Sequence, residues 1–450
     1  MRLLTLAVLI GLLAAPVPSS GQDGPSLTLA DAIRIALESS PEVEEGEATE
    51  AQAEVGIRQA RAGYLPRVSY TESFQRSDNP VFVFGSLLNQ GIFSASSFDI
   101  PALNDPSPLS NFRSAIGVEQ TLFDGRRTRA AVRAARAGRD LASTRATGGR
   151  ADVLLEVVQA YFGAVLAGER LAAADQAVRT AESDLARARA MLDAGMTTQA
   201  DVLSVQVFLA ETHEAQVRAR HEGTIAHAAL GDAMGVDLDR HYVLTTPLTA
   251  PPSVMASLER YETDAIEHSP ALRAASLSRD IASARTTLAQ GSLWPSVVAQ
   301  GSLESHRDGL FGDGQSSWLA GVALRWDLWS GSNRAAAAAA RHAYTAANAA
   351  RRDAESQTRL TVRRAYYELE SARERAAIGA AALAAAEASH RIVQNRYGAG
   401  LVDVTELIRS QAALLDVRVR RLGAVFDWRV ARAALEHAAG NLSPGSDALR

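Results

Sequence analysis

The sequence predicts a mainly α-helical protein with a small β part, in which one structural unit occurs twice. An internal repeat is the first observation: Ser40-Pro41 recurs as Ser269-Pro270, and the residues around Phe123 correspond to those around Trp329. Two Ala/Arg/Glu/Leu-rich stretches are the second, because helices of roughly 65 residues reach about 100 Å. Two pairs of short alternating runs are the third. We therefore expect a first repeat over 22–235, a connecting segment over 236–269, a second repeat over 270–440 and a tail over 441–450.

The composition excludes several classes of protein. Hydrophobic residues make up 47% and charged residues 22% of the 450 residues, with a formal net charge of −5, which is typical of a folded chain rather than a disordered or collagen-like one. The chain has no cysteine, so disulfides, thiol catalysis, zinc–thiolate sites and a lipidated N-terminal cysteine are excluded. No basic tract stands out, and we expect no nucleic acid partner.

Residues 1–21 have the pattern of a secretory signal peptide. Arg2 supplies the positive start, Leu3–Ala15 the apolar core, and small residues precede Gln22. The apolar core is shorter than the ~20 residues that a membrane-spanning helix needs. After residue 22 no run approaches ~18 consecutive apolar residues, so the mature chain would cross a membrane only as a β-barrel.

Each repeat is expected to contain a helix, two strands, a long helix, a tight turn and a last helix. Ser40-Pro41 and Ser269-Pro270 begin the first helices with a capping hydroxyl and a proline, and Pro66 and Pro295 end them. The first repeat then has expected strands at 66–76 and 112–123, a long helix over 126–192, a tip turn over 193–198 and a helix over 199–234. The second has expected strands at 296–305 and 318–329, a long helix over 332–396, a tip turn over 397–403 and a helix over 404–439.

The first repeat carries an extra segment between its strands, the loop 76–111. It is rich in Phe, Leu and Ile amid Ser, Asn and Pro. Because an exposed apolar loop is unfavourable, we expect it to fold over the mouth of a barrel or against neighbouring chains. A lid and plain packing material are both open interpretations of this segment.

The strands suggest a membrane sheet that one chain cannot complete. The last strand places Trp318, Val322, Leu324 and their alternate neighbours on one side and Arg325 on the other, and it has about the ~10 residues of a membrane strand. Four strands do not close a barrel, which needs about 8, and an open edge is not tolerated in lipid. If the strands span a membrane, several chains must combine them. The alternative is a pair of half-buried hairpins in a soluble helical protein.

With these features in order, the mature chain resembles the TolC-like outer-membrane efflux protein family. The resemblance rests on Leu27-Thr28-Leu29-Ala30-Asp31-Ala32, Tyr64-Leu65-Pro66, Leu122-Phe123-Asp124-Gly125, Gly195 and Gly400 in the tip turns, Asp201-Val202-Leu203 and Glu406-Leu407-Ile408. It implies a homotrimer with a 12-strand β-barrel in the outer membrane and an α-helical barrel through the periplasm. It also implies partners at the tip, a periplasmic adaptor (membrane fusion) protein and an inner-membrane transporter, for which the trimer is a passive exit duct.

The resemblance also assigns roles to the tip turns, for which local structure offers an alternative. Thr198-x-x-Asp201 and Asp403-x-x-Glu406 both have the form of capping boxes. The resemblance implies that Asp403, Glu406 and Asp201 lie at the narrowest part of the tunnel. It implies adaptor contacts for six turn residues, which could equally be plain helix caps: Gly195, Met196, Thr197, Gly400, Leu401 and Val402.

Four aromatic residues are expected at the ends of the strands, where a membrane protein places an interfacial belt in contact with lipid. They are Tyr64, Phe123, Trp294 and Trp329.

Catalysis is not indicated. His213, His221 and His227 do not share one helical face as metal ligands would, and the sequence has no phosphate-binding loop, zinc-protease motif or nucleophile elbow. We expect no enzyme activity, no metal and no cofactor. A soluble periplasmic or surface coiled-coil scaffold or adhesin is the alternative function.

Overall fold

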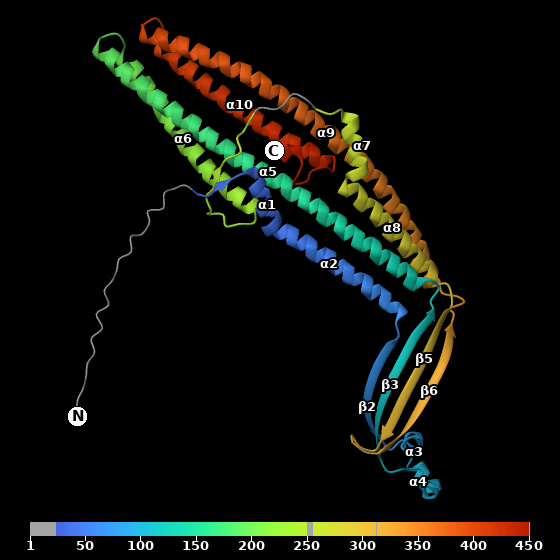
Figure 1. Cartoon of the computed structure of the whole chain (residues 1–450). Coiled ribbons are helices and arrows are strands. Elements are labelled where there is room, and N and C mark those ends of the chain that lie inside the picture. Colours follow the sequence, from blue (N-terminus) through green and yellow to red (C-terminus); the bar gives the residue numbers. More distant parts are fainter. Residues whose placement is uncertain (1–23, 250–254, 312, 450) are drawn as a thin grey trace, which may run out of the picture.

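The computed structural model describes residues 24–249, 255–311 and 313–449. The predicted signal peptide, 1–21, lies outside these ranges. The molecule is a long rod with a β-sheet at one end and the turns of two helical hairpins at the other (Figure 1).

Two long helices, α5 (Arg127–Asp193) and α9 (Gly331–Gly398), run most of the length of the rod. Two shorter helices, α2 (Pro41–Arg61) and α6 (Gln199–Ala233), pack one after the other along α5. In the same way α8 (Pro270–Gly291) and α10 (Val404–Ala438) pack along α9. Contacts of α5 with α8 and α10 join the two repeats into one body.

The four longer strands form one antiparallel sheet in the order β2-β3-β5-β6. Their bounds are Arg67–Ser77, Leu109–Phe123, Ser296–Arg307 and Gly314–Arg325. The last strand differs from the expected 318–329. Ser296 is the first residue of β5 and pairs with Arg325, so residues beyond Arg325 have no strand to pair with, although their apolar alternation continues.

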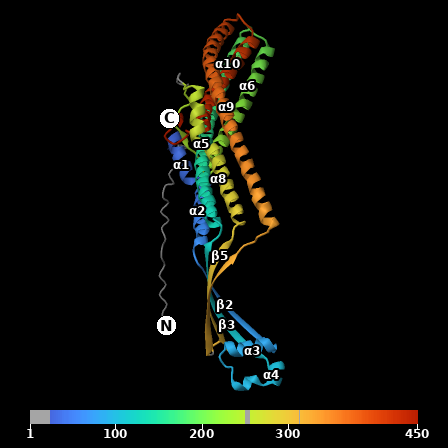
Figure 2. The same cartoon turned by 90° about the vertical axis from the view of Figure 1, so that its right-hand side faces the viewer.

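The expected loop 76–111 is partly helical, which corrects the prediction. It contains α3 (Pro80–Asn89), a short 3-10 helix (Ala95–Phe98) and α4 (Ile100–Asn104). The Asn79 side chain caps α3 by accepting from two backbone amides at 3.1 Å, and Pro80 takes the first helical position, where its missing amide costs nothing. The segment projects to one side of the sheet (Figure 2).

A small cap covers the middle of α5. It combines α1 (Leu29–Ser39) with two short parallel strands, β1 (Ser26–Leu27) and β4 (Val243–Leu244). The fully buried Tyr161 holds this cap, because its hydroxyl donates to the Leu27 carbonyl and accepts from the Thr246 amide, both at 2.9 Å. On the other repeat α7 (Leu258–His268) packs on α9.

Among the described residues, one helix is long enough to cross a membrane and contains a sufficiently apolar stretch of 18 residues. That helix is α5, and half of this stretch is buried inside the chain. Its apolar side chains form the largest buried cluster, around Val157, Tyr161 and Phe162.

Candidate functional site

The two hairpin tips are built alike. Gly195 and Gly400 adopt φ values of 70° and 72°, the left-handed conformation in which glycine ends a helix. In each turn the amide after the glycine bonds back to the carbonyl five residues earlier, at 2.8 Å in the first tip and 2.9 Å in the second. The residue that donates this bond has an exposed side chain: Met196 in the first tip and Leu401 in the second are both 66% exposed. Each tip therefore presents one apolar side chain.

The predicted capping box is complete in the first tip and half made in the second. The Thr198 hydroxyl accepts from the Asp201 amide at 3.2 Å, and the Asp201 carboxylate accepts from the Thr198 amide at 3.0 Å. In the second tip Asp403 accepts from the Glu406 amide at 2.9 Å. The Glu406 carboxylate does not reach back, because Arg409 lies 3.1 Å away and binds it.

These contacts distinguish the three acids. Three hydrogen bonds from Thr197 and Thr198 engage the Asp201 carboxylate, and they lower the pKa of Asp201, the bond from the Thr198 amide most of all. Asp201 is therefore held as a charged cap. Asp403 is exposed and makes a single capping bond, so it keeps free acceptor capacity at the tip.

An apolar cluster beneath the tips packs the two hairpins together. It includes Leu185 and Met191 of α5, Val202 of α6, Tyr397 of α9 and Leu407 of α10. The Tyr397 side chain is 2% exposed, and its hydroxyl has no hydrogen-bond partner among the described residues. Burial, followed by the negative charges of Asp201 and Asp184, raises the pKa of Tyr397.

A buried acid, Asp184, lies in the same region and did not stand out in the sequence. It is 2% exposed, and within the described chain no hydrogen bond of ordinary geometry reaches its oxygens. Burial raises the pKa of Asp184, against the opposing charge of Arg187 at 3.9 Å and a weaker hydrogen bond from the Gln394 side chain. Its spacing from Ala181 and Ala188, both buried, is the signal that could have shown it on the packed face of the helix.

The sheet has one apolar and one polar face, as strand alternation requires. The apolar face is open to the surroundings: Tyr70 is 66%, Trp318 79% and Val322 68% exposed. Near its end towards α3 this face also carries an ion pair between Glu72 and Arg307 at 3.3 Å. The polar face carries a shallow hollow whose polar lining residues are Arg67, Ser69, Glu119, Gln300 and Ser302.

The segment between β2 and β3 is fixed to the polar face. The Gln90 amide donates to the Ser110 carbonyl at 2.8 Å and to the Asn111 side chain at 3.1 Å. The Asn111 side chain in turn lies 3.1 Å from His306 Nδ1. On the same face Arg113 and Glu304 form a bidentate pair at 2.9 and 2.6 Å. Buried polar contacts therefore direct α3 and α4 to the polar side of the sheet.

The four predicted aromatic residues all lie where the sheet meets the helices. Tyr64 and Trp294 precede β2 and β5, Phe123 ends β3, and Trp329 follows β6. They are 44 to 76% exposed. The Arg334 guanidinium lies 4.1 Å from the centre of the Trp329 ring.

Among the residues that the structure describes, no group of His, Cys, Asp and Glu side chains is arranged to hold a metal ion. His227, one of the three histidines considered above, lies beside His241 instead, with ring centres 6.0 Å apart.

Comparison with known proteins gives matches over nearly the whole chain. The family described as outer membrane efflux protein matches residues 32–236 and 263–441. Protein CyaE of Bordetella pertussis is 30% identical over 444 residues, which cover 95% of this chain and 87% of that protein.

Solved structures share the fold. A membrane protein from Pseudomonas aeruginosa has a TM-score of 0.80 at 19% identity, with 99% of each chain covered. The outer membrane protein VceC from Vibrio cholerae has a TM-score of 0.76 at 18% identity, with 92% of this chain and 96% of VceC covered. The family match takes in both repeats, including both tips and all four strands. The chain belongs to the outer membrane efflux protein family, a family of outer-membrane channel proteins and not of enzymes.

Proposed function

We propose that three copies of this chain form the exit duct of a tripartite efflux or type I secretion system. One observation carries the proposal: in the described chain, a four-stranded sheet with an exposed apolar face has two open edges, one along β2 and one along β6. An open sheet edge is not tolerated in lipid, and four strands are too few to close. Three copies would pair these edges in a 12-strand barrel, with the polar face towards the lumen.

The helices then form the periplasmic part of the duct. Helices α2, α5, α8 and α9 pack side by side next to the sheet. The same four helices of three chains would continue the wall of the barrel as an α-helical tunnel. The aromatic residues at the junction would lie in the lipid interface, where amphipathic rings are favoured.

The tips are the proposed docking end for a periplasmic adaptor and an inner-membrane transporter, which supplies the energy. Met196 and Leu401 are the apolar contacts, flanked by Gly195, Thr197, Gly400 and Val402. Asp403 and Glu406 would form acidic rings at the narrowest point, of which the Asp403 ring would attract cations more strongly, because Arg409 pairs with the Glu406 carboxylate. Asp201 takes part mainly as a cap, since its carboxylate is already engaged.

The experiment compares arginine substitutions on the two faces of β6. Val322→Arg places a charge on the apolar face, which costs about 2–4 kcal/mol at the centre of a bilayer. Leu319→Arg, on the polar face, is the matched control and should assemble normally. Oligomeric mass in detergent and conductance in planar bilayers are the measurements. Equal assembly of both variants, or a conductance-free protein extracted without detergent, would favour the coiled-coil scaffold instead.

A further inference from the structure

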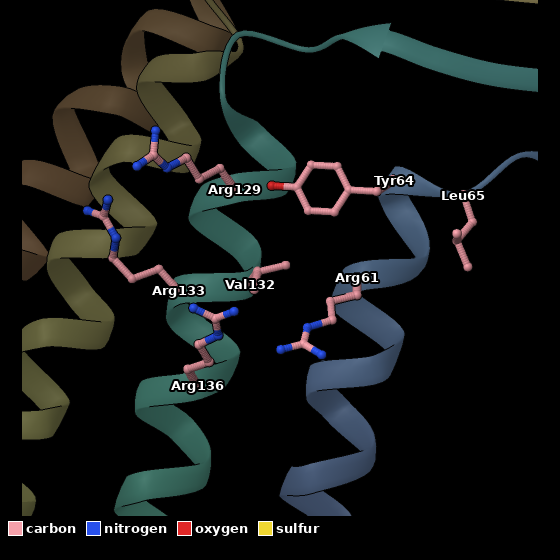
Figure 3. A pocket seen from close by; sticks show the side chains of 7 residues that line it. All are labelled: Arg61, Tyr64, Leu65, Arg129, Val132, Arg133 and Arg136. Atoms are coloured by element: carbon pink, nitrogen blue, oxygen red, sulfur yellow. The ribbon is translucent and has the colours of Figure 1, made fainter.

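A hollow lined by four arginines lies between α2 and α5, at the end of these helices that adjoins the sheet (Figure 3). Arg61 ends α2, whereas Arg129, Arg133 and Arg136 lie on one side of the first turns of α5. In Figure 3 the Arg61 and Arg136 side chains extend into the space between the two helices, whereas Arg129 and Arg133 extend from α5 away from α2, towards α8. All four side chains are exposed.

Among the described residues these arginines have no acidic partners, unlike the arginines farther along the same groove. Arg139 of α5 lies 3.6 Å from Glu54 of α2, and Arg150 lies 2.7 Å from Glu47. Nearer the sheet the pairing stops: within the described part of the chain, no ion pair includes any of the four arginines of the hollow.

The position of the charges on α5 is itself unfavourable. The helix begins at Arg127, and its start is already complemented by an acid, because the Asp124 carboxylate accepts from the Thr128 amide at 2.6 Å. The arginines at 129, 133 and 136 are three and four residues apart, and like charges at this spacing repel each other. A bound anion would relieve this repulsion.

The hollow also has an apolar rim at the level where the sheet begins. Tyr64 is 54% and Leu65 65% exposed, and both directly precede β2, whose apolar face starts at Val68. From Arg129 to Arg136 the helix advances about 10 Å. If the apolar face lies in the hydrocarbon, the hollow begins in the headgroup layer, which is roughly 5–8 Å thick on each side of the bilayer, and extends a few ångström beyond it.

We propose that this hollow binds the phosphate of a membrane lipid headgroup, an inference that rests on the membrane position proposed for the sheet. A guanidinium binds two phosphate oxygens at once, and Arg61 and Arg136 face each other across a space in which one phosphate would contact both. Tyr64 and Leu65 would contact the apolar part of the lipid, as side chains at an interface do. The site would fix the depth of the duct in the membrane.

The test measures lipid retention by native mass spectrometry of the intact oligomer in detergent, with phosphatidylglycerol as the probe. Replacing both Arg61 and Arg136 with alanine should lower the affinity for this lipid about tenfold or more, because each basic residue near a lipid surface contributes about 1 kcal/mol. Diacylglycerol, which lacks the phosphate, should not be retained by either form.

Arg189 and Arg220 provide the matched control. Both are exposed, on α5 and α6 in the half of the rod away from the sheet, and their double alanine variant loses the same charge but should keep the lipid. If alanine at Arg61 and Arg136 prevents assembly, lysine at both positions keeps the charge but not the two-oxygen contact, and should still bind several-fold more weakly.

Two outcomes would overturn the proposal. Equal lipid retention by the wild type and the Arg61/Arg136 variants would show that the hollow is an ordinary solvated surface. Displacement of the lipid by millimolar inorganic phosphate, but not by chloride at equal ionic strength, would show a site for soluble phosphate. Conductance measured on the same preparations separates these failures from failure of the channel, since the arginines are not needed for an open pore.

Discussion

Asp184→Asn should stabilise the packed hairpins beneath the tips at neutral pH. The carboxylate is 2% exposed, and no hydrogen bond of ordinary geometry reaches it in the described chain, the nearby Gln394 side chain being only a weak donor. Leaving a buried polar group unsatisfied costs about 1–3 kcal/mol, and more if it is charged. Arg187, at 3.9 Å and 36% exposed, offsets only part of this cost because solvent screens it. Asparagine has nearly the same shape without the charge, so we expect a gain of about 1–2 kcal/mol per chain at pH 8.

The gain should depend on pH with a defined sign. Because burial raises the pKa of Asp184 above its usual value of 3.8, the folded state binds more protons than the unfolded state between the two pKa values. The free energy of unfolding therefore falls as the pH rises through that window. The penalty is complete above the folded pKa and absent below 3.8. The difference between Asp184→Asn and wild type should thus be largest at pH 8 and shrink towards zero at pH 4.

Thermal unfolding of the detergent-solubilised protein at a fixed scan rate measures this difference. At about 1 °C per kcal/mol for a chain of 450 residues, the variant should unfold about 1–2 °C higher than wild type at pH 8. Glu182→Gln, an exposed acid two residues earlier in the same helix, is the control and should change little at either pH. A lower unfolding temperature for Asp184→Asn at pH 8 would refute the reasoning, because it would mean that the carboxylate anion has a favourable partner in the assembled protein.

Three further predictions concern the cap, the tip and the segment beyond the sheet. Tyr161→Phe leaves the Thr246 amide without its partner and removes one donor to the Leu27 carbonyl, which keeps the Thr245 amide at 3.1 Å, and it should lower the free energy of unfolding by about 1–3 kcal/mol; an unchanged melting curve would contradict the role given to the hydroxyl. Asp403→Cys should form disulfides between chains under mild oxidation if the tip is constricted, whereas no crosslink under any oxidant would count against a narrow tip. Replacing 78–108 with a short turn should raise the single-channel conductance if α3 and α4 narrow the mouth, and equal conductance would reduce them to packing material.

The sequence predicted the elements whose signals are local and missed those that depend on distant partners. Proline and serine at the starts of α2 and α8 act within one helical turn, so the helices were found close to their actual bounds. The end of β6 depends on its pairing with Ser296, which the alternation around Trp326 and Trp329 does not encode. Asp184 was missed for the same reason, because its burial arises from packing between two hairpins. Glu406 fits the capping pattern, but its carboxylate binds Arg409 and not the amide of Asp403. The motif does not include this competing partner.

The solvent-accessible surface of the chain is large for its mass. It amounts to 27354 Å², whereas a compact monomer of this mass exposes about 16,000 Å². Residues outside the described ranges account for at most about 5,000 Å² of the difference, even at the value for an unfolded chain. The rest comes from a rod only one helix layer thick over much of its length and from a sheet with an open apolar face. In the proposed trimer each chain covers its neighbours, so part of the stabilisation of the fold arises between chains. Dissociation should then be coupled to unfolding, and the unfolding midpoint should rise with protein concentration. If the protein is diluted a hundredfold until the trimer dissociates and its unfolding midpoint stays the same, the isolated rod is stable by itself.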